Sequence, residues 1–400
     1  MLPNLNSNVE DWINQCERND IQSQHPISIQ LSSILDGMPF HQVRSLSSFW
    51  KEEPVGSILQ HSIDFVTSAH VYQDYLTFVV QSTACGIRIF YSLKNSQSLI
   101  DTLASAFPGI VLDNNPIHNL ADELAENQNQ MGMLSGIPSL KTNFEVPSHI
   151  QSKSWPMIPT ILERVIRGLQ GKDWMFIVQA YARPAEELIN ERREILEILA
   201  NILPMKHNQL QKSIQQTQQD ANRATITSSK MIGGETINRQ AEYAARIYER
   251  QLDRVDAFIR TGRWQTSVYF GAPDQVTTEN LAALLQGVYS GKDSWPERLQ
   301  AHLCQPNGEK PEKFQTYLSS DELALLCKPL IEEAPGYEIR DYSVFDIEKE
   351  VKTDPRLDLG QIKWNEKQSG NIYPVAIDQL SKHGIVAGVT GSGKTTTILN

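Results

Sequence analysis

The chain has 400 residues, 40% of them hydrophobic, and a formal net charge of −11 from 36 basic and 47 acidic residues. This length predicts two or three domains with buried cores. The acidic balance disfavours a DNA-binding face along the whole chain, because phosphate binding needs clustered Lys and Arg. It remains compatible with a protein that holds DNA only through the lumen of a ring.

The spacing of the cysteines and the distribution of apolar residues indicate the cellular compartment of the protein. Cys16, Cys85, Cys304 and Cys327 lie far apart and form no C-x-x-C pair, which disfavours a zinc knuckle and a dense disulfide framework. The N-terminus has no basic segment followed by an apolar stretch, and no window of about 18 apolar residues occurs. We expect a cytoplasmic protein without direct membrane insertion.

Residues 1–70 form an N-terminal segment whose role the sequence does not indicate. After it, 75–83 and 86–93 are β-branched and aromatic runs around the turn Ala-Cys-Gly, which predicts a hairpin. A helix should follow from Ser96, a good N-cap residue, and end at Pro108-Gly109. A short strand is expected at 109–113.

Strand and helix patterns then recur along the chain. Alternation and helical spacing predict helices at 158–169, 185–203, 237–261 and 278–289, and strands at 174–182 and 264–272. Thr278 and Glu279 are expected to open the last helix. We interpret the alternating charges of 237–261 as a solvated face with pairs four residues apart, in preference to a nucleic-acid-binding stripe.

The domain organisation follows from these elements. Residues 71–335 are predicted to form an α+β module with a mixed or antiparallel sheet, which serves partner docking or oligomerisation. Polar stretches near 114–154 and 207–236 are interpreted as excursions. A short helix from Asp321 is followed by a turn at Pro335-Gly336 and then by a strand-like run at 338–345. Residues 336–400 are predicted to be linker strands and the start of a RecA-like α/β P-loop domain.

The motif that carries chemistry is G-x-x-x-x-G-K-T, between Gly388 and Thr395. A buried-type strand precedes it and a helix-forming run follows it. Glycines at Gly391 and Gly393 allow backbone N–H groups to point at phosphate, beside the positive end of a helix. This pattern predicts an ATP site with magnesium.

Each loop residue has an expected role. Lys394 reaches the β- and γ-phosphates and Thr395 ligates magnesium, so both are the candidate catalytic residues. The candidate nucleotide-binding residues are Gly388, Thr390, Gly391, Ser392, Gly393, Lys394, Thr395 and Thr396. Phosphoryl transfer also needs an acidic residue and an arginine finger, which P-loop folds place later. We therefore expect a truncated ATPase domain, inactive as the 400-residue chain alone.

The run from 377 to 397 resembles the entry to the ATPase core of the HerA–FtsK superfamily. The positions that carry the resemblance are Asp378, Leu380, Lys382, His383, Ile385 and Ala387 to Thr395. For His383 a structural role is favoured over a catalytic one. The resemblance implies a ring-forming, hexameric ATP-hydrolysing helicase or translocase of double-stranded DNA, acting in phage defence or DNA processing with a nuclease partner.

Two alternatives remain open. HerA proteins usually begin with a small β-barrel, whereas a large mixed α and β region precedes the core here. Because of this departure, the first alternative is a conjugative ATPase of type IV secretion. Such a protein would have a secretion complex as its partner. The other alternative is a scaffold that binds ATP without hydrolysing it.

Overall fold

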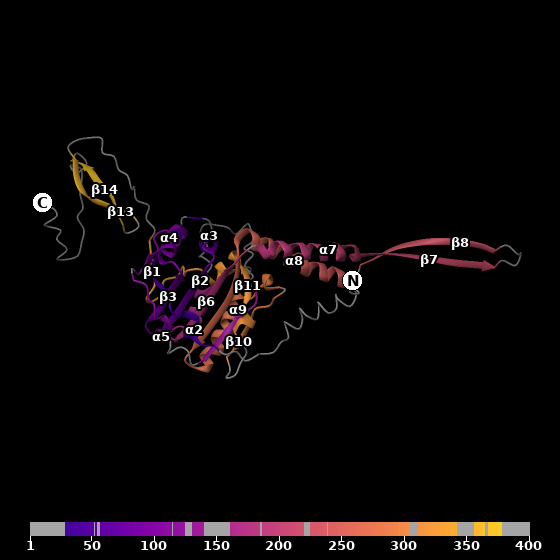
Figure 1. Cartoon of the computed structure of the whole chain (residues 1–400), viewed down its shortest axis with the longest axis horizontal. Coiled ribbons are helices and arrows are strands. Elements are labelled where there is room, and N and C mark those ends of the chain that lie inside the picture. The colour runs from indigo at the N-terminus through magenta and orange to yellow at the C-terminus, as the bar shows by residue number, and fades with distance from the viewer. Residues whose placement is uncertain are drawn as a thin grey trace. The chain divides into compact units, whose positions relative to one another are not determined.

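The computed structural model in Figure 1 describes residues 29–51, 53, 57–113, 115–124, 130–139, 161–184, 186–219, 225–237, 239–295, 297–304, 311–341, 356–364 and 367–377. The chain divides into two units, Met1–Arg340 and Asp341–Asn400. Each unit is described by itself below.

A large sheet forms the centre of the first unit. Its strands are β1 (His41–Ser47), β2 (Tyr75–Thr83), β3 (Gly86–Leu93), β4 (Val111–Leu112), β5 (Gln130–Ser135), β6 (Trp174–Arg183), β9 (Arg263–Ala272), β10 (Gln300–Leu303), β11 (Thr316–Ser319) and β12 (Glu338–Arg340). The order is β10-β5-β9-β6-β2-β3-β1-β12, with β11 paired to β9 and β4 to β1. Among the described residues, β1 with β12 is the one parallel pair. The first unit is therefore a mixed α and β fold with a mostly antiparallel sheet, which agrees with the predicted α+β module with a mixed or antiparallel sheet.

The predicted strands at 75–83, 174–182 and 264–272 are neighbours at the middle of the sheet. β9, β6 and β2 pair antiparallel in that order, and β2 forms the predicted hairpin with β3. Their apolar residues are buried on both faces, as Phe78 and Val80 belong to one core cluster and Val79 to another. The β-branched and aromatic character of these strands follows from this double burial.

Helices cover both faces of the sheet. The larger cluster lies under α3 (Ser57–Val71), α4 (Ser96–Ala106), α6 (Ile161–Gly168), α9 (Gln275–Tyr289) and α10 (Ser320–Cys327). The smaller cluster includes residues of α2 (Leu31–Leu35), α5 (Leu120–Glu123) and the 3-10 helix η6 (Pro311–Phe314). The first unit also contains the short 3-10 helices η1 (Phe49–Lys51) and η5 (Lys292–Ser294).

A helical hairpin is inserted between the neighbouring strands β6 and β9. Its helices α7 (Glu186–Ile202) and α8 (Arg239–Thr261) pack on each other around Leu188, Ala245 and other apolar residues. They continue through η4 (Leu203–Lys206) into a two-stranded ribbon of β7 (His207–Gln219) and β8 (Thr225–Ile237) (Figure 1). The segment 207–236, which the sequence indicated as a polar excursion without assigned secondary structure, contains this ribbon.

Other sequence-based expectations also need correction. The polar stretch 114–154 contains α5 and β5, and β5 pairs with both β9 and β10. The N-cap of α4 is Asn95, whose side chain accepts hydrogen bonds from the Gln97 and Ser98 N–H groups, so Ser96 is the first helical residue. Asp274 caps α9 four residues before the predicted start at Thr278. In both cases an Asn or Asp oxygen satisfies the free N–H groups of the first turn.

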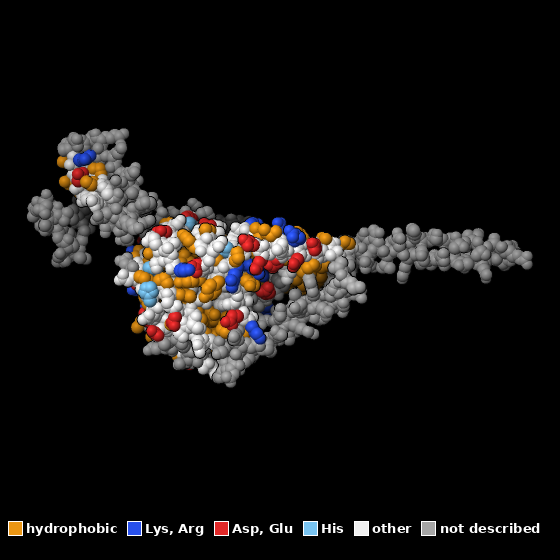
Figure 2. Space-filling view, viewed as in Figure 1, with side chains coloured by type: hydrophobic (Ala, Val, Ile, Leu, Met, Phe, Trp, Pro, Cys, Tyr) orange, Lys and Arg blue, Asp and Glu red, His pale blue; other side chains and the backbone are white. Residues whose placement is uncertain are grey.

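The charges of α8 are used in tertiary contacts as well as on a solvated face. Arg254 is 11% exposed at its side chain and forms ion pairs with Glu297 at 3.5 Å and Glu322 at 3.2 Å. Arg250 pairs with Asp293 at 3.8 Å. These arginines therefore join α8 to elements distant in sequence. Figure 2 shows acidic and basic side chains interspersed in this region.

The described part of the second unit is a hairpin. It consists of β13 (Arg356–Trp364) and β14 (Lys367–Ala376), paired antiparallel, and both lie in the region 336–400 where linker strands were expected. In the described part of the whole chain, no helix combines the length and the apolar character that crossing a bilayer requires.

Candidate functional site

The predicted phosphate-binding loop lies outside the described residues, which end at Ile377 after β14. The same holds for the upstream positions from Asp378 to Ala387 that carry the family resemblance. Every candidate ATP and magnesium ligand, from Gly388 to Thr396, therefore stays a prediction from sequence, and so does the RecA-like fold expected to follow. A second candidate site lies in the first unit.

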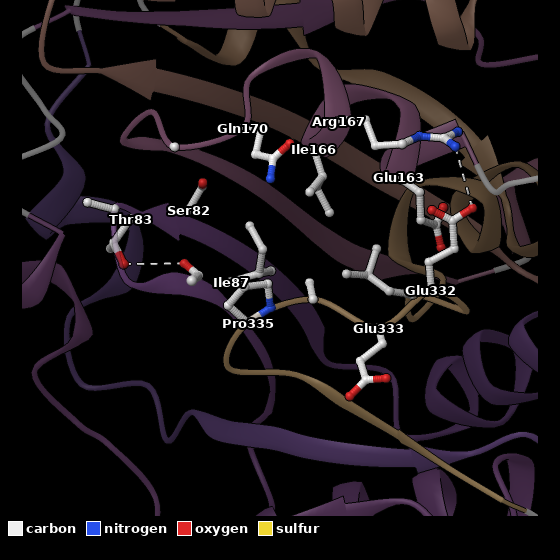
Figure 3. A pocket seen from close by; sticks show the side chains of 15 residues that line it. Ser82, Thr83, Ile87, Glu163, Ile166, Arg167, Gln170, Glu332, Glu333 and Pro335 are labelled. Carbon is white, nitrogen blue, oxygen red and sulfur yellow. Dashed lines mark hydrogen bonds and ion pairs between the residues drawn. The ribbon is translucent and has the colours of Figure 1, made fainter.

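A pocket of about 270 Å³ lies between three segments that are far apart in sequence (Figure 3). The turn between β2 and β3 contributes Ser82, Thr83 and Ile87, and α6 with its following turn contributes Glu163, Ile166, Arg167 and Gln170. The third wall is the segment after α10, with Leu330, Glu332, Glu333, Ala334 and Pro335.

Close backbone contact holds the third wall against the β2–β3 turn. The Ile87 N–H donates to the Pro335 carbonyl at 2.7 Å. Gly86 has φ +147, and a Cβ at this position would lie 2.2 Å from the same carbonyl oxygen. Only glycine therefore fits here, for both conformational and steric reasons. The predicted turn at Pro335-Gly336 is confirmed, closed by the bridge between Ala334 and Tyr337.

Two buried tyrosines fix the path of the chain from α10 to this turn. The Tyr91 hydroxyl donates to the Cys327 carbonyl at 2.6 Å, and the Tyr337 hydroxyl donates to the Leu330 carbonyl at 2.8 Å. Cys327 is the last residue of α10 and Leu330 lies in the irregular segment after it, so each bond satisfies a carbonyl that the helix itself does not pair. The segment that carries Glu332 is thereby anchored to the core.

Glu163 is the most unusual side chain of the pocket, because it is a carboxyl group that is only 2% exposed. One oxygen, Oε1, accepts a hydrogen bond from the Ile331 N–H at 2.8 Å. The other, Oε2, is buried and has no hydrogen-bond partner among the described residues. Burial raises the pKa of Glu163 to about 7, although nearby Lys328 and the Ile331 N–H act in the opposite direction.

The remaining charges of the pocket are more exposed. Glu332 and Arg167 form an ion pair at 3.8 Å, with side chains 39% and 54% exposed. Figure 3 shows the Glu332 carboxylate beside Glu163, and its negative charge further raises the Glu163 pKa. Glu333 is exposed and Glu332 is half-buried. The pocket lining thus carries three carboxyl groups and one guanidinium.

The Glu163 pKa predicts a pH-dependent stability. A carboxyl whose pKa rises from 4.5 to about 7 on folding binds its proton more tightly in the folded state, so the free energy of unfolding falls as pH rises across this window. Glu163→Gln keeps the shape and removes the charge. We expect the variant to gain up to about 3 kcal/mol over the wild type between pH 5 and 8, at roughly 1.4 kcal/mol per pKa unit.

Urea denaturation of both proteins at several pH values measures this difference. Glu338→Gln is the matched control, because Glu338 is 57% exposed at its side chain and lies on β12 outside the pocket. If the difference in the free energy of unfolding between Glu163→Gln and the wild type stays constant across the pH range, the raised pKa of Glu163 is contradicted.

The described residues contain no group of three or more His, Cys, Asp or Glu side chains that could hold a metal ion. Cys85, Cys304 and Cys327 are free thiols. The predicted magnesium ligand, Thr395, lies outside the described residues, so this finding does not bear on it.

No protein-family model matches the chain, and no curated protein matches its sequence. The resemblance to the HerA–FtsK superfamily therefore rests on the residues between 377 and 397 alone.

Sequence reasoning did not find the pocket. In the sequence, Glu163 belongs to the helical run ILERVIRG and has the appearance of a solvent-facing residue. Its burial results from contact with residues about 170 positions later, which no local pattern indicates.

Proposed function

We propose that the chain provides the nucleotide-binding start of an ATP-hydrolysing DNA translocase or helicase subunit of the HerA–FtsK type. The observation that carries the proposal is the run IVAGVTGSGKT, residues 385–395, in which a strand-like segment leads directly into a complete P-loop. An isolated glycine-rich turn needs neither the preceding apolar strand nor the Lys-Thr pair that follows. The combination favours a phosphate-binding function.

The proposed chemistry assigns the residues of the loop to parts of one nucleotide. Backbone N–H groups from Thr390 to Gly393 surround the β-phosphate, Lys394 neutralises charge on the β- and γ-phosphates, and Thr395 contributes its hydroxyl to magnesium. The acidic residue and arginine finger that complete hydrolysis belong to other parts of such a protein.

The first unit is assigned to partner docking or oligomerisation. It has its own sheet and three core clusters, so it is built as a module separate from the loop. Ile189 and Leu196 support this role, because they lie seven residues apart on α7 and are 59% and 46% exposed. Residues at this spacing lie on one side of a helix, where they provide apolar area for another protein surface.

The test is ATP turnover by the full-length gene product, measured with and without double-stranded DNA. We expect magnesium-dependent hydrolysis that double-stranded DNA stimulates, and a hexamer in light scattering with nucleotide present. Turnover that DNA does not change, together with co-purifying membrane-channel proteins, would favour the secretion-type ATPase. Binding of ATP without turnover would contradict both ATP-hydrolysing functions, and the scaffold that binds ATP without hydrolysing it would then be favoured.

A further inference from the structure

We propose that the pocket beside Glu163 binds a small organic cation, namely a primary ammonium or guanidinium group on a short alkyl chain. The proposal concerns the first unit and is independent of the ATP site. It rests on the geometry around Glu163, the charge of the pocket lining and the shape of the cavity.

The first argument is the unsatisfied carboxyl oxygen. Glu163 is 2% exposed, and its Oε2 has no hydrogen-bond partner among the described residues, while Oε1 is held by the Ile331 N–H. A buried acceptor without a donor is costly, and native structures normally supply one. A ligand N–H group that enters the pocket next to Glu163 would provide the missing donor and an opposite charge.

The second argument is the balance of charge around this oxygen. Glu163, Glu332 and Glu333 line the pocket, against Arg167 alone, and Arg167 is paired with Glu332. Lys328 acts on Glu163 from the segment after α10, but no ion pair joins the two side chains in the described structure, and burial lowers the Lys328 pKa. The lining therefore attracts a cation and repels an anion.

The third argument concerns which cation fits. The cavity of about 270 Å³ far exceeds the roughly 10–15 Å³ that a single water needs by the same measure, and the described residues offer no three-ligand metal group. Ile87, Ile166 and Leu330 supply an apolar wall. An alkyl chain can pack against this wall while a guanidinium or ammonium at its end donates to the carboxylates.

Binding should depend on pH through Glu163, because only its charged form attracts a cation. The groups that face Glu163 are Lys328 and Glu332 from the segment after α10, Tyr337 from the turn that follows, and Tyr289 from the end of α9. Burial raises the pKa values of both tyrosines, which keeps them neutral near pH 7. Glu163 is therefore the group of this set expected to titrate in that range.

The experiment is isothermal titration of the intact chain with agmatine, an alkylguanidinium that also carries a primary ammonium. We expect saturable binding at about pH 8 that weakens about tenfold or more at pH 6 and in Glu163→Gln. Ile166→Trp, which fills the pocket and leaves all three carboxyl groups in the chain, should also abolish binding. Glu338→Gln, on the exposed side of β12, should bind agmatine as the wild type does.

Two further ligands complete the test. N-butylacetamide has a similar alkyl chain without charge and should not bind. N-acetylarginine methylamide imitates an arginine of another protein; if it binds as tightly as agmatine the natural source is a protein side chain, and if agmatine binds more tightly the source is a free amine. The proposal is overturned if agmatine gives no saturable signal, if Glu163→Gln binds it like the wild type while retaining the wild-type circular dichroism spectrum, or if the neutral amide binds equally.

Discussion

Lys394→Ala is expected to reduce ATP turnover by the full-length protein by about 100-fold or more, because a preorganised charge at the reacting phosphates contributes several kcal/mol to transition-state stabilisation. In the predicted loop the Lys394 ammonium lies at the β- and γ-phosphates, where negative charge is transferred as the bond to the leaving group breaks. No neutral side chain can replace this interaction. The effect should appear as a loss of kcat in a steady-state ATPase assay with saturating magnesium.

The matched control for this prediction is Lys94→Ala. Lys94 lies in the first unit, is 78% exposed at its side chain and pairs with Asp74 at 3.6 Å. Its replacement removes the same charge from the chain and should leave turnover unchanged. Wild-type turnover in Lys394→Ala, with an intact fold, would contradict a catalytic P-loop and with it the motor proposal.

Trp264→Ala is expected to lower the free energy of unfolding of the first unit by about 3–5 kcal/mol, the range for removal of a large buried aromatic side chain. Trp264 is the second residue of β9 and is fully buried. Its indole Nε1 donates to the Ser320 hydroxyl at 3.0 Å, and its ring meets the His70 ring edge to face at 5.1 Å between centroids. One side chain therefore joins the sheet to α10 and α3.

Urea denaturation of the intact chain, followed by circular dichroism, measures this loss as a lower midpoint. Trp264→Phe retains much of the volume but leaves the Ser320 hydroxyl without its donor, so its midpoint should lie between those of wild type and Trp264→Ala. Val276→Ala is the surface control, since Val276 is 64% exposed on α9, and should change stability by less than about 0.5 kcal/mol. Equal midpoints for Trp264→Ala and this control would show that Trp264 does not join these elements.

The elements that sequence predicted well are those whose signal is local. The β2–β3 hairpin is visible because both strands and their turn are consecutive, and the runs that became β6, β9 and α8 are long and strongly patterned. β5 is short, and its segment QMGMLS has a glycine where a Cβ would lie 2.4 Å from the Phe270 ring. Its strand state depends on pairing with β9 and β10, which are distant in sequence.

The ribbon of β7 and β8 illustrates the same limit. Its Gln-, Ser- and Thr-rich sequence lacks the alternation of apolar and polar residues that indicates a half-buried strand, so the sequence indicated a polar excursion and no strand. The strands form nevertheless, because α7 and α8 pack antiparallel and bring the ends of the two segments together. Hydrogen bonding between the two strands then needs no buried face.

By itself the sequence determined the phosphate-binding prediction, since a P-loop takes its donors from consecutive residues, Gly388 to Thr395, and its chemistry can be read without knowing the fold. It also indicated the central strands of the first unit. The pocket was decided only by the tertiary structure. Glu163 has the local pattern of an exposed helical residue, and it becomes a buried carboxyl group because the segment around Ile331, fixed by Tyr91 and Tyr337, packs over it. Burial is a property of what covers a residue, and here the covering residues lie far along the chain.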